Sequence, residues 1–404
     1  MRSGSYATWS SKMKKLHILH IASFSGNIGD NFNHMGFVPW FEEFFDAPVE
    51  WTRLEIREFY WKERSWDESF VELANTHDLV VVGGGNYFEL WVESSPTGTS
   101  IAIDPATFSK IKTPVFFNAL GVDPGQGVPE SSRQRFTKFL NQLLDSTQFI
   151  VSVRNDGAAA NLRQHIGEKF ADAVQVVPDH GFFALNSEFS KLEIFPRKNG
   201  TRRIAINIAN DMPEIRFSNF RSQDDFLQEM AGALTAVAHE DSSVELLFVP
   251  HIFRDVEFIA KILGHLEDRL RRTRVAIAPF GSGDVAARVA MQHYLNSELT
   301  LGMRFHASVC PIGMGCETLG LACYPQIRSL YEELGEPDRC VELGRPGFSE
   351  ELKNQILRGL NRPFEFSSSP AAAIERVQRQ RENFSRKLRD WLAANELTHR
   401  LSNR

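Results

Sequence analysis

The sequence contains few cysteines and no long hydrophobic segment. Only 4 of its 404 residues are cysteine, and no two of them form a Cys-x-x-Cys pair. So few cysteines in a chain of this length cannot supply a disulfide framework, and their spacing matches no zinc site. The longest apolar runs, such as Leu79–Val82, have the length of a strand. A membrane-spanning helix needs roughly 18 apolar residues. These absences exclude a disulfide-rich secreted domain and a helical membrane protein.

The sequence also lacks an excess of basic charge. Its 45 Lys and Arg residues are outnumbered by 51 Asp and Glu residues, which gives a net charge of −6. This balance predicts no nucleic-acid partner, and any anion site must be local and built from a few arginines. The first twelve residues are polar and the apolar run from Leu16 is short, so we expect no secretory signal. We interpret residues 1–15 as a leader or tag and expect a cytoplasmic protein.

What the sequence does contain is an alternation of strand and helix patterns in two series. The first series runs from Leu16–Ser23 to Val174–Val177, and the second runs from Arg203–Ile208 to Leu321–Tyr324. Buried apolar strands that alternate with amphipathic helices predict parallel sheets covered on both faces. We therefore predict an α/β protein with two Rossmann-like domains facing a cleft. Expected ranges are 16–195 for the first domain, 196–345 for the second and 346–404 for a helical tail, with a polar linker at Asn186–Arg203.

The tail is expected to form a long amphipathic helix from Pro370 onward. Its apolar stripe contains Ile374, Val377, Phe384, Leu388 and Trp391, and its other face is rich in arginine. Such a stripe is typical of a helix that packs on a domain. The alternative is peripheral contact of the basic face with a membrane surface.

Ligands of open parallel sheets bind beyond the carboxyl ends of the strands, so we searched those positions for chemistry. Two glycine-containing turns lie there, and they supply the candidate residues Asn27, Gly29 and Asp30, and Gly84, Gly85 and Asn86. Glycine lets backbone amides face a ligand, and Asp30 could cap the following helix. The first segment could equally be a tight capped turn, and the second a flexible turn, because neither is a Gly-x-Gly-x-x-Gly fingerprint.

Arginine and histidine stand at two further strand ends. Arg154 ends a strand, where burial requires an anionic ligand or a carboxylate partner such as Asp156 or Asp179. Arg304 and His306 follow a later strand and could both point into the cleft. Arginine can grip a carboxylate or phosphate, and histidine can move protons near neutral pH. The alternative is a salt-bridged arginine and a core histidine.

Other titratable groups near strand ends are weaker candidates. Asp179 and His180 follow one strand, and His251 follows another. His306 could share a helix face with Cys310, but the cysteine spacings match no zinc pattern. We therefore predict no metal site and no cofactor.

Taken in order, several segments resemble the polysaccharide pyruvyl transferase family. The matching segments, spread over Leu16–Leu343, are Gly26–Asp30, Asp78–Asn86, Pro114–Gly121, Ser152–Arg154, Pro178-Asp179 with Phe182, and Arg304–Ala307. The sequence departs from the family pattern at Phe305, often Leu or Tyr there, at Asn155-Asp156 after Arg154, and at Tyr324–Arg328, which lacks a lysine common in that loop.

The resemblance implies a fold like that of the GT-B glycosyltransferases and transfer of pyruvate from phosphoenolpyruvate to a sugar, usually as a ketal. It also implies that Arg154, Arg304 and His306 hold phosphoenolpyruvate. We predict that His306 is the acid, that the arginines grip the donor, and that Asp30, Asp179 and His180 serve the acceptor. The acceptor would be a glycan or lipid-linked saccharide of polysaccharide or exopolysaccharide synthesis.

Two alternatives remain at this stage. A nucleotide-sugar-dependent glycosyltransferase of the same architecture would use Arg304 on a diphosphate, although no acidic ribose-binding signature is apparent in the second half of the sequence. A non-catalytic glycan-binding protein of the same fold would not need both Arg304 and His306.

Overall fold

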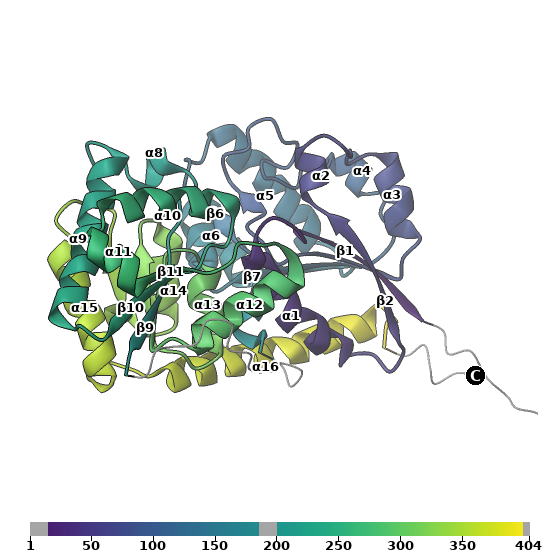
Figure 1. Cartoon of the computed structure of the whole chain (residues 1–404). Coiled ribbons are helices and arrows are strands. Elements are labelled where there is room, and N and C mark those ends of the chain that lie inside the picture. Colours follow the sequence, from purple (N-terminus) through teal and green to yellow (C-terminus); the bar gives the residue numbers. More distant parts are fainter. Residues whose placement is uncertain (1–14, 186–199, 399–404) are drawn as a thin grey trace, which may run out of the picture.

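Each half of the chain forms a parallel sheet of six strands (Figure 1). The computed structural model describes residues 15–185 and 200–398, so nearly all of the expected leader and most of the expected linker lie outside the described residues. The first sheet has the order β2-β1-β3-β5-β7-β8, and its strands are Val49–Glu55, Leu16–Ala22, Leu79–Gly83, Val115–Leu120, Phe149–Arg154 and Gln175–Val177. The second has the order β11-β10-β9-β12-β13-β14, and its strands are Val275–Ile277, Val244–Phe248, Arg202–Asn207, Leu299–Gly302, Thr318–Ala322 and Cys340–Glu342.

Most of the helices bury apolar side chains in the cores around these sheets. In the first half they are α1 (Ile28–Glu42), α2 (Arg57–Tyr60), α3 (Glu68–Asn75), α4 (Pro105–Phe108), α5 (Glu130–Leu144), α6 (Ala158–His165) and α7 (Glu168–Ala173), followed by the 3-10 turn η1 (His180–Phe183). In the second half they are α8 (Pro213–Arg216), α9 (Gln223–Glu240), α10 (Phe253–His265), α11 (Asp268–Arg274), α12 (Gly283–Leu295), α13 (His306–Gly313), α14 (Pro325–Glu333), η2 (Pro337–Arg339), α15 (Ser349–Asn361), η3 (Pro363–Glu365) and α16 (Pro370–Ala394). A short parallel pair, β4 (Phe88–Glu89) with β6 (Val122–Asp123), lies beside the first sheet.

The strand orders place the chemistry-bearing loops. The order of the first sheet reverses between β1 and β3, and that of the second reverses between β9 and β12. Loops after such neighbouring strands diverge to opposite faces and leave a crevice where ligands bind. Gly26–Asp30 and Gly83–Asn86 follow the strands at the first switch point, and Arg304–His306 follows a strand at the second. The candidate segments therefore lie at the two crevices of the fold.

The end of the chain joins both halves. Leu352, Ile356 and Leu360 of α15 lie in the core of the second domain, so this helix belongs to that domain although we expected it in the tail. Helix α16 crosses both halves along one side of the molecule (Figure 1). Its Val377 packs with the second half, whereas Phe384, Leu388 and Leu392 pack with the first. Within the described residues, no helix combines the length and apolarity that crossing a membrane requires.

Candidate functional site

A buried cluster of Arg154, Asp179 and His306 joins the two halves. Arg154 ends β7, Asp179 follows β8, and His306 begins α13. His306 Nε2 lies 3.3 Å from Asp179 Oδ2, and Arg154 Nη1 lies 3.7 Å from the same oxygen. The three residues expose 3%, 0% and 6% of their surfaces, respectively. The structure therefore brings together three of the residues that the sequence singled out.

The contacts of Arg154 and Asp179 keep these two side chains charged. Arg154 Nε donates to Asp156 Oδ2 at 2.8 Å, and its guanidinium lies 4.3 Å from the ring centroid of Phe305. Asn33 Nδ2 and the Gly181 amide donate to the Asp179 carboxylate at 3.0 and 2.7 Å. Burial raises the pKa of Asp179, but His306, Arg154 and the Gly181 amide outweigh it, so this pKa lies well below its usual range. Asp179 is therefore a carboxylate that orients the imidazole.

The start of α1 lies against His306. A Cβ on Gly29 would stand 2.7 Å from His306 Nδ1, so only glycine leaves room for the imidazole. Asn27, rather than Asp30 as expected, caps the helix, because its side chain accepts from the Gly29 amide at 3.0 Å. Asp30 lies inside the first turn and pairs with Arg57 at 3.4 Å. The Ile28, Gly29 and Asp30 amides all have acceptors within the chain, so this turn offers the ligand a close surface rather than free amides.

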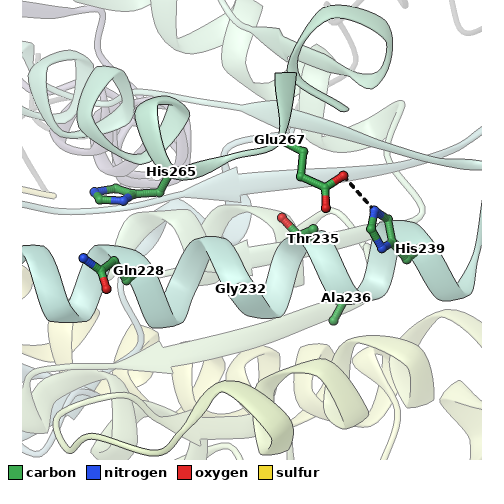
Figure 2. A pocket seen from close by; sticks show the side chains of 7 residues that line it. All are labelled: Gln228, Gly232, Thr235, Ala236, His239, His265 and Glu267. Atoms are coloured by element: carbon green, nitrogen blue, oxygen red, sulfur yellow. Dashed lines mark hydrogen bonds and ion pairs between the residues drawn. The ribbon is translucent and has the colours of Figure 1, made fainter. Parts of the chain in front are cut away.

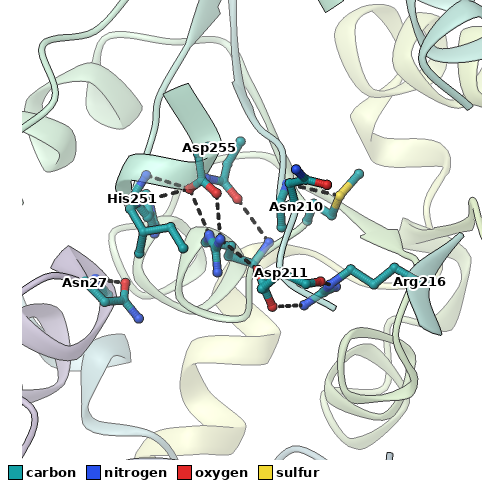
Figure 3. A network of polar contacts seen from close by, with 12 residues as sticks. Asn27, Asn210, Asp211, Arg216, His251 and Asp255 are labelled. Atoms are coloured by element: carbon teal, nitrogen blue, oxygen red, sulfur yellow. Dashed lines mark hydrogen bonds and ion pairs between the residues drawn. The ribbon is translucent and has the colours of Figure 1, made fainter. Parts of the chain in front are cut away.

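Arg304 lies in an ion-pair network on the second half with Asp255 and Asp211, which are labelled in Figure 3. Its Nε and Nη2 bind both oxygens of the fully buried Asp255, at 2.8 and 2.6 Å, and Nη2 lies 2.7 Å from Asp211 Oδ1. Asp211 in turn pairs with Arg216 at 2.7 Å. Within the described chain, no hydrogen bond or ion pair joins Arg304 to Arg154 or His306. Arg304 therefore has the carboxylate partners of a salt-bridged arginine and secures the turn that carries His306.

The glycine turn after β3 leaves room for the side chains that pack against it. A Cβ on Gly84 would meet the Asn33 side chain at 2.6 Å, and one on Gly85 would meet the Tyr87 ring at 2.4 Å. Asn86 Nδ2 donates to Asp123 Oδ2 at 2.8 Å, and Tyr324 of the second half donates to Asp123 Oδ1 at 2.6 Å. The turn thus allows Asn33 to support Asp179 and places Asn86 at the seam between the halves.

Two candidate histidines lie apart from the cluster contacts. His180 packs on Trp40 and Phe37, and its Nε2 lies 3.0 Å from Asn118 Oδ1. Burial lowers the pKa of His180 to about 3, which leaves it neutral. His251 is also buried, and its Nε2 lies 2.5 Å from the Tyr294 hydroxyl. Both histidines therefore have the contacts of core residues.

A groove of about 460 Å³ lies elsewhere, along α9 and the connection from α10 to α11 (Figure 2). Its two histidines have carboxylate partners, since His239 Nε2 lies 2.9 Å from Glu267 and His265 Nε2 lies 2.9 Å from Asp224. The groove runs along helices rather than at the carboxyl ends of strands. In the described part of the chain, no group of three or more His, Cys, Asp or Glu residues is arranged to hold a metal ion.

Comparison with known proteins identifies the family. The sequence pattern described as polysaccharide pyruvyl transferase matches residues 26–324. The chain belongs to this family. This family is one of transferases that act on polysaccharides. A search of curated proteins by sequence returns no match.

Solved structures confirm the GT-B-like fold. A trehalose 6-phosphate synthase from Burkholderia multivorans is 11% identical, with 97% of this chain and 100% of that chain covered and a TM-score of 0.56. Anabaena Alr3699/HepE, solved with UDP and glucose, is 13% identical over 95% and 99% of the two chains, with a TM-score of 0.53. A glycosyltransferase from Rickettsia africae is 14% identical over 94% and 98%, also with a TM-score of 0.53. At these identities the likeness concerns the fold alone.

Sequence reasoning missed several residues that hold Asp179 and Arg304 in place. Asn33 supports Asp179 from within α1, and Asp255 and Asp211 hold Arg304. These partners are distant in sequence, so no local pattern could indicate them. Asp123 and Tyr324 had a usable signal, because each directly follows an apolar strand segment. Asp156 was considered only as a partner of Arg154, which the structure confirms.

Proposed function

We propose that the protein transfers the pyruvyl group of phosphoenolpyruvate to two hydroxyls of a glycan sugar and forms a ketal. The observation that carries this proposal is the buried cluster of Arg154, Asp179 and His306, in which side chains of the two halves meet. A buried arginine beside a histidine suits a compact donor that is both anionic and activated by protonation. The family membership supports pyruvyl transfer, and the cluster supports the donor.

Arg154 is the proposed grip on the donor. Its Nε is taken by Asp156 and its face lies over Phe305, so the guanidinium is held in one orientation. Its Nη2 would stand 2.7 Å from a Cβ on Gly121, where the absence of a side chain leaves the nitrogen close to the backbone. Charge-assisted bonds from this nitrogen edge would bind a carboxylate or phosphate oxygen. Arg304 adds positive charge nearby while it secures the turn that begins α13.

His306 is the proposed acid. Its Nδ1 is covered by Gly29, so Nε2 is the nitrogen on the side of Asp179 and Arg154. In this proposal the bound donor replaces the long 3.3 Å contact between Nε2 and Asp179 Oδ2, and Nε2 then gives its proton to the methylene carbon of the donor. The remaining carbon becomes cationic and is attacked by a sugar hydroxyl.

The proposed reaction balances without a further reactant. The first hydroxyl forms a C–O bond to the cationic carbon, phosphate leaves, and the second hydroxyl closes the ketal. Two hydroxyl protons are released; one replaces the proton spent on the methyl group and the other leaves with phosphate. No redox step occurs. We propose that the site needs no cofactor, because its cations are arginine and histidine side chains.

The decisive experiment measures donor binding and turnover together. Phosphoenolpyruvate should raise the melting temperature, and phosphate release should depend on a glycan acceptor. UDP-sugars should not stabilise the protein. Stabilisation by a UDP-sugar but not by phosphoenolpyruvate would instead favour a glycosyltransferase, the second candidate, which the GT-B-like fold also accommodates. Stabilisation by neither, together with glycan binding, would identify a non-catalytic glycan-binding protein.

We also predict that donor binding survives removal of divalent metal. After dialysis against a chelator, calorimetry should give the same affinity for phosphoenolpyruvate, because the proposed ligands are protein cations. Loss of binding that magnesium or manganese restores would contradict this prediction.

A further inference from the structure

A small cavity between the two halves adjoins the proposed donor site. It measures about 50 Å³ and is lined from the first half by Asn86, Asp123 and Asp156, and from the second by Tyr324 and Gln326. A buried water needs about 10–15 Å³, so this space admits a few hydroxyl-sized groups but no complete sugar ring. Its lining is polar, although it lies at a seam between two domains.

On one wall of the cavity, both carboxylate oxygens of Asp123 accept hydrogen bonds from within the protein. Asp123 Oδ2 accepts from Asn86 Nδ2 at 2.8 Å, and Asp123 Oδ1 accepts from the Tyr324 hydroxyl at 2.6 Å and from the Gly125 amide at 2.8 Å. Burial and the neighbouring Asp123 raise the pKa of Tyr324, so its hydroxyl stays a donor. This wall fixes the shape of the cavity.

Two acceptor oxygens of the lining have no hydrogen-bond partner within the described part of the protein. Asp156 exposes only 4% of its surface, and its Oδ2 accepts from Arg154 Nε at 2.8 Å and from Gln326 Nε2 at 2.6 Å. Its second oxygen, Oδ1, has no partner, and neither does Asn86 Oδ1. Unpaired buried acceptors are costly, and a carboxylate oxygen more so than an amide oxygen. A ligand of this cavity must therefore donate hydrogen bonds, which sugar hydroxyls do and which phosphate or carboxylate groups do not.

The unpaired acceptors lie next to the donor-gripping arginine. Asp156 is bonded to Arg154 directly. Asn86 Oδ1 and Arg154 Nη2 would stand 2.3 and 2.7 Å from one and the same point, a Cβ on Gly121. A hydroxyl bonded to these acceptors would therefore lie beside a donor held by Arg154, as nucleophilic attack requires.

We propose that this cavity is the acceptor subsite and takes the two reacting hydroxyls of a neutral sugar, with Asp156 Oδ1 accepting the proton of the attacking hydroxyl. The inference rests on the proposed function. The O–H bond breaks as the new C–O bond forms, and the proton passes from Asp156 to the departing phosphate. Because the lining presents carboxylate and amide oxygens, the sugar edge that enters must be uncharged.

The first test replaces the unpaired acceptor, Asp156 Oδ1, with a hydrogen-bond donor. In Asp156→Asn, the amide oxygen can keep Arg154 Nε and Gln326 while its NH₂ takes the place of Oδ1. Using methyl glycosides of glucose, galactose and mannose and of the matching uronic acids, we expect the acceptor KM of neutral glycosides to rise about tenfold, as loss of one buried bond implies. The kcat should fall, and discrimination against uronides should weaken. Calorimetric affinity for phosphoenolpyruvate should change less than threefold. Asp172→Asn, which alters an exposed pair with Arg163, is the matched control.

A second variant blocks the cavity without touching Arg154. A Cβ on Gly125 would stand 1.7 Å from the Tyr324 hydroxyl, so Gly125→Ala must push this side chain and close the space. Binding of the neutral glycosides, measured by calorimetry without phosphoenolpyruvate, should be lost, while Gly232→Ala, whose Cβ meets nothing within 4 Å, should keep it. Unchanged glycoside binding in Gly125→Ala, or an unchanged acceptor KM in Asp156→Asn, would overturn the subsite. Failure of the wild-type protein to bind phosphoenolpyruvate would overturn the proposed function instead, because glycoside binding is measured independently.

Discussion

Asp179 and His180 are neighbours in the sequence but differ in environment. The carboxylate faces Arg154 and His306, whereas the imidazole packs on Trp40. Paired charges lower the pKa of the Asp179 carboxyl, and burial lowers the pKa of the His180 imidazole. Their position after a strand predicted that both lie near the site. Only the turn η1, which sends adjacent side chains in opposite directions, decides which of them can act there.

The environment of Arg304 likewise could not be predicted from its position after a strand. The Arg-x-His spacing predicted two cleft-facing side chains, but Arg304 forms a paired bond with Asp255, 49 positions away. A fold brings such partners together, and a local pattern does not contain them. The motif nevertheless indicated the turn at which His306 meets Asp179.

His306→Gln should separate donor binding from proton transfer. Glutamine keeps the size and can bond Asp179 but cannot act as an acid. We expect turnover to fall by about 10²–10⁴-fold, the usual contribution of general acid catalysis, with donor affinity changed little. Steady-state rates beside calorimetry check this, and His239→Gln, a surface histidine paired with Glu267, is the control. Normal turnover combined with lost binding would leave His306 a binding residue only.

Arg154→Lys and Arg304→Lys should differ in how strongly they weaken donor binding. Lysine at 154 keeps the charge but loses the planar fork that holds the buried Asp156 and a donor anion together, so donor affinity should fall by about 10–100-fold, more than for Arg304→Lys, and the melting temperature should also fall. Lysine at 304 cannot pair with both oxygens of the buried Asp255. The melting temperature should therefore fall, together with a raised KM for phosphoenolpyruvate. Equal losses of donor affinity with no loss of stability would show that both arginines grip the donor directly.

At the scale of elements, alternation of buried strands and helices was enough to predict both sheets. This alternation was less informative about the residues at which the helices begin and end. Between β10 and β11, for example, two helices stand in succession, because α10 ends at His265 and α11 begins at Asp268. Asp255 also has a tertiary role, since its carboxylate accepts from the His251 and Ile252 amides while it holds Arg304. Boundaries depend on such contacts more than on periodicity.

Helix α16 is the element whose role can be tested most directly. Phe384 and Leu388 are buried against the first half and Val377 against the second, as the apolar stripe predicted. Phe384→Ala should lower the free energy of unfolding by about 3–5 kcal/mol, because it leaves a cavity between α16 and the sheet. Urea denaturation measures this, and Lys387→Ala on the exposed face should have little effect.

Removal of residues 370–404 distinguishes the structural from the membrane interpretation of the same helix. We expect a large loss of stability, since each exposed apolar side chain forfeits about 1.5–3 kcal/mol. A truncated protein with an unchanged melting temperature that no longer floats with anionic vesicles would instead support membrane contact through the basic face.

At the scale of the whole molecule, both halves contain titratable groups whose pKa values are shifted by burial. The pKa is lowered, mainly by burial, for the histidines His20, His34, His180, His251 and His293. It is raised, again mainly by burial, for the carboxyls of Glu89 and Glu333, both to about 7, and of Glu336. These groups are distributed over both halves and couple the fold to pH.

The sign of this coupling follows from proton uptake. Histidines that stay neutral in the folded protein take up protons on unfolding once the pH falls below about 6.5, and for His180 this continues down to about 3. Glutamates with a raised pKa act in the opposite direction, because the folded protein already holds their protons. The histidines with a lowered pKa, which also include His165, outnumber the three glutamates with a raised pKa, so unfolding takes up protons on balance. The free energy of unfolding should therefore fall by about 1–3 kcal/mol per pH unit below pH 6. Asp179 adds nothing in this range, since its lowered pKa matters only below its ordinary value.

Urea denaturation at pH 7.5, 6.5, 5.5 and 4.5 tests this expectation. The midpoint should be highest at pH 7.5 and should fall most steeply below pH 6. His180→Asn should reduce stability at pH 7.5, because the ring packs between Trp40 and Phe37, but should make the pH slope shallower by about 1.4 kcal/mol per unit. His239→Gln, an exposed histidine, should leave the slope unchanged. A midpoint that stays constant from pH 7.5 to 4.5 would mean that the buried histidines take up protons without unfolding, and that the core around them opens to water.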